Sequence, residues 1–303
     1  MRHPEQALLV DIGDGGNGKS LLYGIVGEDI LGRTPAGYST EIPVEALLAS
    51  KGERHPTELM PLWGARLALA RESGETTYFN EGRVKTLTGG DPIQARYMRQ
   101  DYITFDPTHI FVVFGNGRPR LRGAAQAAWR RRLQMTIYPQ RFGDRAIPER
   151  DIILADRQLR EKLRGELPGI LYRLIQGCLE YQRIGLCPPD TVRHASEEYL
   201  REENLIAQFL DERCDRSEEC SCGSETCPCP PRSDELKPRY ATVTANELWS
   251  ELKSWAAARK RVPGGRMEFN SRLEDLGIRV VRSHASRGVC HGIALKDWRG
   301  AGA

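Results

Sequence analysis

The chain lacks the long apolar runs that membrane proteins and secretory precursors carry. Among its 303 residues the longest purely apolar run is Ile110–Phe114, far shorter than the ~20 residues that a membrane-spanning helix needs. The amino-terminal residues contain neither the apolar stretch nor the small-residue cleavage site of a signal peptide. We therefore expect a soluble, cytoplasmic protein that has no membrane partner.

The sequence also has little net charge, +3, so the overall balance does not identify a partner. The distribution of charge is uneven, because residues 94–145 contain ten arginines, three aspartates and no lysine. Guanidinium groups bind phosphate as planar forks, so this stretch favours a phosphate-bearing partner such as nucleic acid. A solvated basic surface is the alternative interpretation.

The eight cysteines are not spread evenly, as they are in a small disulfide-stabilised domain. Five of them lie between Cys214 and Cys229. Four of these form a C-x-C-x4-C-x-C pattern, namely Cys220, Cys222, Cys227 and Cys229. Zinc ligands usually come in pairs spaced by two to four residues. The pattern therefore leaves two interpretations open, a zinc site and a polar linker with reduced thiols.

The first half of the chain alternates between predicted strands and helices. Short apolar runs over 6–13, 65–72 and 108–116 predict buried strands, and the stretches 19–32 and 44–50 predict helices. This alternation favours a mostly parallel sheet that is covered by helices on both faces.

The second half is helical at first. A helix is predicted to begin near Pro168 and to end before Pro188 and Pro189. Its apolar residues recur at helical spacing, and we expect them, with Cys178, to form core: Ile170, Leu171, Leu174, Ile175, Cys178 and Leu179. Two further helices over 244–261 and 267–277, followed by two strands within 278–295, have the order of a winged helix-turn-helix.

A glycine-rich loop links the first predicted strand to the helix that follows it. The stretch "GDGGNGKS" has the full spacing of a phosphate-binding P-loop. Glycines let successive N–H groups point into one concavity, and the helix N-terminus adds positive field. Lys19 can reach the outer phosphates, and Ser20 can ligate Mg²⁺. The residues expected to hold ATP are Gly13, Gly15, Gly16, Asn17, Gly18, Lys19 and Ser20.

Two other strand ends carry residues that suit nucleotide hydrolysis. Glu72 follows the strand over 65–72 and can hold Mg²⁺ or polarise water, with Glu75 as a second candidate. Two surface glutamates in a turn are the alternative. Asn116 ends the strand over 108–116, where its amide can orient the attacking water or contact the γ-phosphate.

Arginines and aromatic residues gather in two further places. The stretch 85–105 predicts a hairpin whose basic and aromatic tip can grip a nucleic-acid backbone, although a hairpin that only packs on a neighbour is also open. Arg130, Arg131 and Arg132 stand together before another predicted strand. Such a cluster needs solvent or anionic partners, and one of these arginines can act as a finger in a neighbouring nucleotide site.

The succession "GDGGNGKS", "ARLALARES", "KTLTGGDPIQAR", "PTHIFVVFGNGRPRLRG" and "AAWRRRLQMTIYPQRF" resembles the superfamily 3 helicase domain of phage and plasmid primase-helicases. The poxvirus primase-helicase belongs to the same group. The resemblance covers nearly the whole chain. It implies an AAA+-like P-loop ATPase that forms a homo-hexamer, binds ATP between subunits and threads single-stranded or forked DNA, in the cytoplasm of a bacterial host.

The resemblance also implies roles for individual residues. Glu72 matches the acidic residue of the second motif, and Asn116 matches the sensor asparagine. Arg132, or else Arg131, matches the arginine finger. The residues implied to contact DNA are Lys85, Arg96 and Arg99.

The expected organisation is an ATPase core over 1–145, a helical segment over 146–213, a cysteine-rich linker over 214–236 and a winged helix over 237–299. Because the chain begins about a dozen residues before the P-loop, we expect no primase activity and a separate primase or origin-binding partner. Two other functions stay open. One is a DNA-binding remnant with weak or no catalysis, and the other is a P-loop kinase for a small molecule.

Overall fold

The computed structural model describes residues 5–49, 55–71, 78–122, 126–216, 242–261, 263, 265–276, 278, 280–283, 286–291 and 293–296. The chain forms two compact units, residues 1–200 and residues 201–303. Their boundary falls inside the helical segment that the sequence predicts over 146–213.

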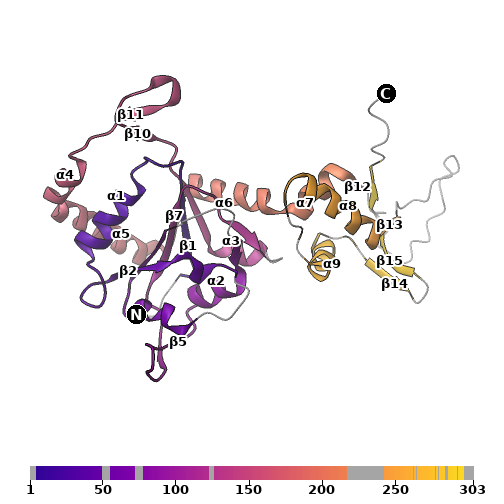
Figure 1. Cartoon of the computed structure of the whole chain (residues 1–303), viewed down its shortest axis with the longest axis horizontal. Coiled ribbons are helices and arrows are strands. Elements are labelled where there is room, and N and C mark those ends of the chain that lie inside the picture. Colours follow the sequence, from indigo (N-terminus) through magenta and orange to yellow (C-terminus); the bar gives the residue numbers. More distant parts are fainter. Residues whose placement is uncertain are drawn as a thin grey trace. The chain divides into compact units, whose positions relative to one another are not determined.

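The first unit is built on a sheet of five parallel strands in the order β2-β3-β7-β1-β9. These strands are β1 (Leu8–Ile12), β2 (Ser39–Pro43), β3 (Leu67–Arg71), β7 (Ile110–Gly115) and β9 (Leu133–Ile137). Strands β1, β2 and β7 of this sheet are labelled in Figure 1. The strands predicted over 6–13, 65–72 and 108–116 are β1, β3 and β7. The predicted α/β class with a mostly parallel sheet is therefore confirmed.

Apolar side chains cover both faces of this sheet. Along β7, Phe111 and Val113 belong to the larger core, whereas Val112 and Phe114 belong to a second cluster on the opposite face. Successive strand residues point to opposite faces, so a strand that is apolar at every position is buried on both sides. Burial on both faces explains why this strand is a continuous apolar run in the sequence.

Helices and short strands surround the sheet. The helical elements are α1 (Lys19–Tyr23), the π-helical η1 (Gly24–Ile30), the 3₁₀ turns η2 (Val44–Leu47), η3 (Pro56–Leu62) and η4 (Pro148–Arg150), α2 (Glu81–Thr88), α3 (Gln126–Arg132), α4 (Leu159–Gly165), α5 (Leu167–Ile184) and α6 (Asp190–Glu203). The short strands form pairs: β4 (Tyr78–Asn80) with β8 (Arg120–Arg122), β5 (Ile93–Ala95) with β6 (Ile103–Phe105), and β10 (Arg141–Gly143) with β11 (Ile152–Leu154).

Two predicted helices differ from the observed ones. The helix predicted over 19–32 continues beyond Tyr23 as a π-helix, an uncommon form that is often found at functional sites. The helix predicted over 44–50 is only the 3₁₀ turn η2. Its apolar residues Val44, Ala46 and Leu47 are buried because the turn packs into the larger core.

The prediction that Cys178 and its neighbours form core is wrong. Helix α5 exists and is apolar on one face, but none of its 18 residues, all of which the structure describes, is buried. Cys178 is exposed. The helix ends at Ile184, before the two prolines as predicted, and Gly185 after it adopts a left-handed backbone with φ 75°.

The second unit contains α7 (Leu205–Arg213), β12 (Cys214–Arg216), β13 (Thr242–Thr244), α8 (Ala245–Ala258), α9 (Arg266–Asp275), β14 (Val280–Ser283), β15 (Ser286–His291) and β16 (Ile293–Leu295). Its core gathers Phe209, Leu252, Trp255, Phe269 and Cys290. The predicted order of two helices followed by paired strands is confirmed by α8, α9 and the antiparallel β14–β15 pair. Its identification as a winged helix remains a prediction.

Within the described ranges, every helix is too short or too polar to span a bilayer.

Candidate nucleotide-binding site

Two features expected to act on a nucleotide, the P-loop and Asn116, follow strands that end at one edge of the sheet, and two further polar residues lie at the same edge. Because all five strands are parallel, their carboxyl ends meet there. The P-loop follows β1, Asn116 follows β7, and Arg71 ends β3. Tyr138 follows β9 on the other side of the P-loop. Ligands of open α/β sheets bind at this edge.

The P-loop has the backbone conformation of a phosphate cradle. Gly15, Gly16 and Gly18 have φ values of 93°, 62° and 81°, which side chains rarely adopt. A Cβ atom on Gly16 would lie 2.8 Å from the Phe142 carbonyl oxygen, so the loop also passes too close to its neighbour for another residue. These glycines and the helix N-terminus that follows them fit a bound phosphate chain.

Lys19 is held at the bottom of this loop. Its side chain is buried, and its amine donates to the Gly13 carbonyl oxygen at 2.9 Å and to the Asn17 side-chain oxygen. Asn17 in turn donates to the Tyr138 carbonyl oxygen at 3.1 Å. Burial lowers the pKa of the Lys19 amine, while the charges of Asp11 and Asp14 act in the opposite direction. Loop, lysine and the end of β9 are thus joined by hydrogen bonds.

A buried carboxylate beneath the loop escaped the sequence analysis. Asp11 on β1 accepts hydrogen bonds from the hydroxyl of Tyr23 and, at 2.9 Å, from that of Tyr138. Burial and the Asp11 charge raise the pKa of Tyr138 to about 12 and raise that of Tyr23 as well. Both tyrosines are therefore hydrogen-bond donors at neutral pH. Asp11 therefore fixes Tyr138, and the Tyr138 carbonyl in turn positions Asn17.

Asn116 lies beside the P-loop, as its predicted sensor role requires. A Cβ atom placed on Gly15 would be 3.6 Å from the Asn116 amide nitrogen. Ser20 lies exposed at the second position of α1. Glu72 and Glu75 fall outside the described residues, so their predicted roles remain predictions.

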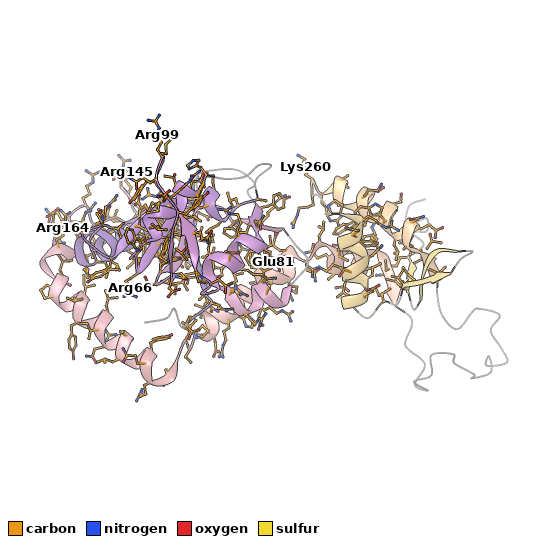
Figure 2. All side chains as sticks on the ribbon, turned by 90° about the horizontal axis from the view of Figure 1, so that it is seen from below. Arg66, Glu81, Arg99, Arg145, Arg164 and Lys260 are labelled. Carbon is orange, nitrogen blue, oxygen red and sulfur yellow. The ribbon has the colours of Figure 1, made fainter. Side chains whose placement is uncertain are left out.

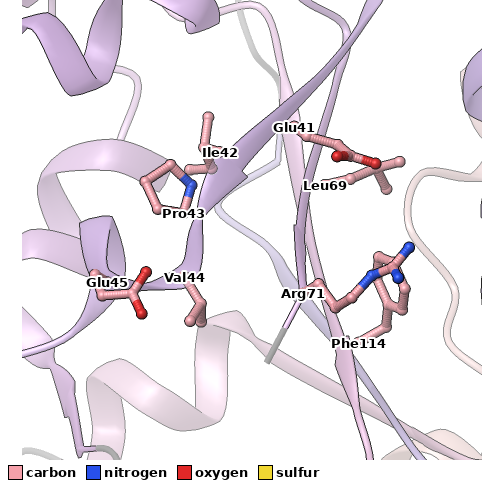
Figure 3. A pocket seen from close by; sticks show the side chains of 8 residues that line it. All are labelled: Glu41, Ile42, Pro43, Val44, Glu45, Leu69, Arg71 and Phe114. Carbon is pink, nitrogen blue, oxygen red and sulfur yellow. The ribbon is translucent and has the colours of Figure 1, made fainter. Parts of the chain in front are cut away.

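A cavity opens at the same sheet edge, on the side of β2, β3 and β7 (Figure 3). It has a volume of about 310 Å³. Its charged lining residues are Glu41, Glu45 and Arg71, and the Arg71 guanidinium lies 5.3 Å from the centre of the Phe114 ring. This volume is at the lower end of small-molecule sites.

The predicted hairpin over 85–105 is confirmed in part. Lys85 lies on α2, where it pairs with Glu81, but β5 and β6 form an antiparallel hairpin. The Arg96 guanidinium stacks 4.6 Å from the centre of the Tyr102 ring. Arg99 projects from the tip with a left-handed backbone, φ 60° (Figure 2). The exposed tip thus presents cationic and aromatic groups, a combination suited to a nucleic-acid strand.

The two candidate finger arginines differ in exposure. Arg132 is buried and donates to the side-chain oxygen of Gln6 at 2.7 Å, inside its own chain. Burial lowers the pKa of its guanidinium. Arg131 is exposed at the end of α3. Only an exposed side chain can reach a neighbouring copy without rearrangement, so the geometry favours Arg131.

The cysteine pattern predicted as a zinc site or linker, Cys220, Cys222, Cys227 and Cys229, lies outside the described residues. Across the part of the chain that the structure describes, no group of three or more His, Cys, Asp or Glu side chains is arranged to hold a metal ion.

Comparisons with known proteins point to viral helicases. Putative helicase 022R of Frog virus 3 (isolate Goorha) is 26% identical over 265 residues, which cover 84% of this chain and 25% of that protein. Putative helicase L207/L206 of Acanthamoeba polyphaga mimivirus is 25% identical over 218 residues, which cover 68% of this chain and 22% of that protein. The chain therefore matches about a quarter of the length of these relatives. It is distantly homologous to proteins named as helicases.

No protein-family model matches the chain. Among solved structures, the apo A form of the C-terminal region of NrS-1 superposes with a TM-score of 0.48 at 11% identity, covering 94% of this chain and 66% of that one. A second structure of the same region gives a TM-score of 0.47 at 8% identity, covering 97% of this chain and 67% of that one.

Proposed function

We propose that this chain is the ATPase motor of a DNA helicase or translocase, of the kind that serves phage or plasmid replication. The observation that carries the proposal is the P-loop with buried Lys19 at the carboxyl edge of a parallel sheet, directly beside Asn116. The distant homology to viral proteins named as helicases supports the same function.

Different residues in and around the P-loop contact ATP and Mg²⁺ in this proposal. The backbone N–H groups of the loop hold the phosphates, and Lys19 turns from the Gly13 carbonyl and Asn17 toward the γ-phosphate when ATP binds. Tyr138 and Asp11 keep Asn17 in place from below. Ser20 would ligate Mg²⁺, which would offset the charge of the phosphates, while Glu72 activates the attacking water and Asn116 orients it.

A second copy completes the site in this proposal. Arg131 of one copy stabilises the transition state in the next, as an arginine finger does in trans. Such a contact is heterologous and closes into a ring. The resemblance to superfamily 3 helicases implies that this ring is a hexamer and that each copy has an AAA+-like core. The site then hydrolyses ATP only in the assembled protein.

The hairpin of β5 and β6 grips the DNA. Arg99 reaches out from its tip, and Arg96 stacked on Tyr102 offers a flat surface to a base. The second unit, with its helix–helix–hairpin order, adds a further DNA contact. ATP turnover is thereby coupled to movement of single-stranded DNA.

The test is ATP hydrolysis by the full chain, with and without single-stranded DNA. We expect Mg-dependent turnover that DNA stimulates, and loss of turnover in Lys19→Ala. Lys162→Ala is the matched control, because this exposed lysine on α4 pairs with Asp156 and has no part in the proposed site. DNA binding without turnover at any concentration would instead identify a non-catalytic remnant.

The cavity at the carboxyl edge of β2, β3 and β7 supports a second candidate, a small-molecule kinase. Its charged residues Arg71, Glu41 and Glu45 offer polar contacts to a small phosphoryl acceptor at the same sheet edge as the P-loop. This function predicts that turnover depends on a small acceptor and is indifferent to DNA. The same assay, run with pools of small polar acceptors, separates the two functions.

A further inference from the structure

Helix α5 presents an apolar face that the described part of the chain does not cover. Leu171, Leu174, Ile175 and Leu179 are each at least 40% exposed, and Cys178 is exposed beside them. Leucine and isoleucine at this exposure are unusual on one contiguous face of a monomer, where patches above a few hundred Å² mark interaction sites.

The spacing of these apolar residues is symmetric along the helix. They occupy positions 170, 171, 174, 175, 178 and 179. Reversing the helix end for end places Ile170 on Leu179, Leu171 on Cys178 and Leu174 on Ile175. The face is thus complementary to an antiparallel copy of itself, which is what a two-fold symmetric contact requires.

We propose that α5 docks on α5 of a second copy of this chain, as an antiparallel pair. The pair would bury an apolar face about 15 Å long on each helix, given the 1.5 Å rise per residue.

This contact differs in symmetry from the ring contact of the proposed function. It is isologous, so it joins copies two by two, whereas a ring contact is heterologous. The inference does not rest on ATP hydrolysis, and either can fail alone. In the pair, Leu171 faces Cys178 of the second copy at the same height, near the centre of the interface.

A disulfide tests this register directly. Leu171→Cys places a thiol opposite Cys178 of the second copy, and oxidised glutathione can take up the two electrons and two protons of the new S–S bond. Within one helix the two positions are seven residues, or about 10.5 Å, apart. A disulfide needs Cα atoms within about 7 Å, so this bond must join two chains.

We expect Leu171→Cys to form a covalent dimer whose linked peptides contain residues 171 and 178. The dimer should disappear when Cys178→Ser is added. Gln176→Cys, exposed on the opposite side of α5, is the matched control and should stay uncrosslinked. A Leu171→Cys chain that remains monomeric, or equal crosslinking in Gln176→Cys, overturns the proposal.

A second measurement uses the unoxidised full chain. Ile175→Asp places a charge at the centre of the pair, so the native mass should fall by half at concentrations where the wild type is paired, with an unchanged circular dichroism spectrum. A wild-type mass of one copy at all concentrations contradicts the proposal, since α5 would then be covered by its own chain or by another partner. An assembly that Ile175→Asp leaves intact contradicts it equally.

Discussion

Helices α5 and α8 have the same kind of apolar stripe but opposite surroundings. On α8, Leu248, Leu252 and Trp255 lie in the core of the second unit, and Trp255 also donates to Glu212 on α7 at 3.1 Å. On α5 no residue of the equivalent stripe is buried, and the stripe is exposed from Leu171 to Leu179. Periodicity in a sequence therefore predicts which face of a helix is apolar. It does not predict what covers that face.

The two helices also begin differently. Thr244 caps α8 by accepting from the Glu247 N–H at 3.2 Å, and the Glu247 carboxylate accepts from the Thr244 N–H at 2.9 Å, a complete capping box. Helix α5 has no side-chain cap. A helix that is packed and capped should tolerate changes poorly, and one that is neither should tolerate them well.

The largest effect is expected for Leu252→Ala. The side chain is fully buried, so its truncation leaves a cavity and should lower the stability of the second unit by about 2–5 kcal/mol. Hydrogen exchange of the α8 backbone amides measures this loss. Exchange that stays at the wild-type rate would show that α8 is not packed as described.

A smaller effect is expected for Thr244→Ala, which removes one half of the capping box. The unsatisfied N–H at the start of α8 should cost about 1 kcal/mol. Thermal denaturation of the two chains at neutral pH gives the difference. Ser250→Ala on the exposed side of α8 is a control that should leave the midpoint within about 1 °C.

The capping box also predicts a dependence on pH. Hydrogen bonds from the Thr244 N–H, and then from its hydroxyl, lower the pKa of Glu247. A carboxyl group whose pKa is lower in the folded chain stabilises the fold at pH values above its unfolded pKa of about 4.3. This stabilisation is lost as the pH falls through the folded pKa. The wild type should therefore lose more stability than Glu247→Gln between pH 5 and pH 3. Parallel acid denaturation curves would contradict the box.

The smallest effect is expected on α5. Leu179→Ala removes a side chain that is already 54% exposed. In dilute protein the free energy of unfolding should change by roughly 0.5 kcal/mol or less. Denaturant titration at two protein concentrations checks this. A loss as large as that of Leu252→Ala in the dilute sample would place Leu179 in a core.

The sequence predicted the P-loop and the strands that present it well, because these depend on local patterns. Strand β7 is a continuous apolar run, and the left-handed backbone of the loop requires glycine at positions 15, 16 and 18. The network of Asp11, Tyr23 and Tyr138 was missed, since Asp11 and Tyr138 are 127 positions apart. Only the pairing of β1 with β9 brings them together.

Arg132 is a residue whose local pattern predicts the wrong exposure. Three adjacent arginines predict exposure, yet β9 begins directly after Arg132 and turns that side chain inward to Gln6. The change from helix to strand at this point decides which arginine stays on the surface. No pattern of residue types in the stretch gives that direction.

The most direct test of the account is binding of Mg-ATP by the full chain, measured by calorimetry. We predict one nucleotide per chain in the wild type and in Lys162→Ala, and at least a tenfold weaker affinity in Lys19→Ala, a loss of about 1.4 kcal/mol or more. Equal affinity in the wild type and Lys19→Ala, or no binding by the wild type with Mg²⁺ present, would contradict the account.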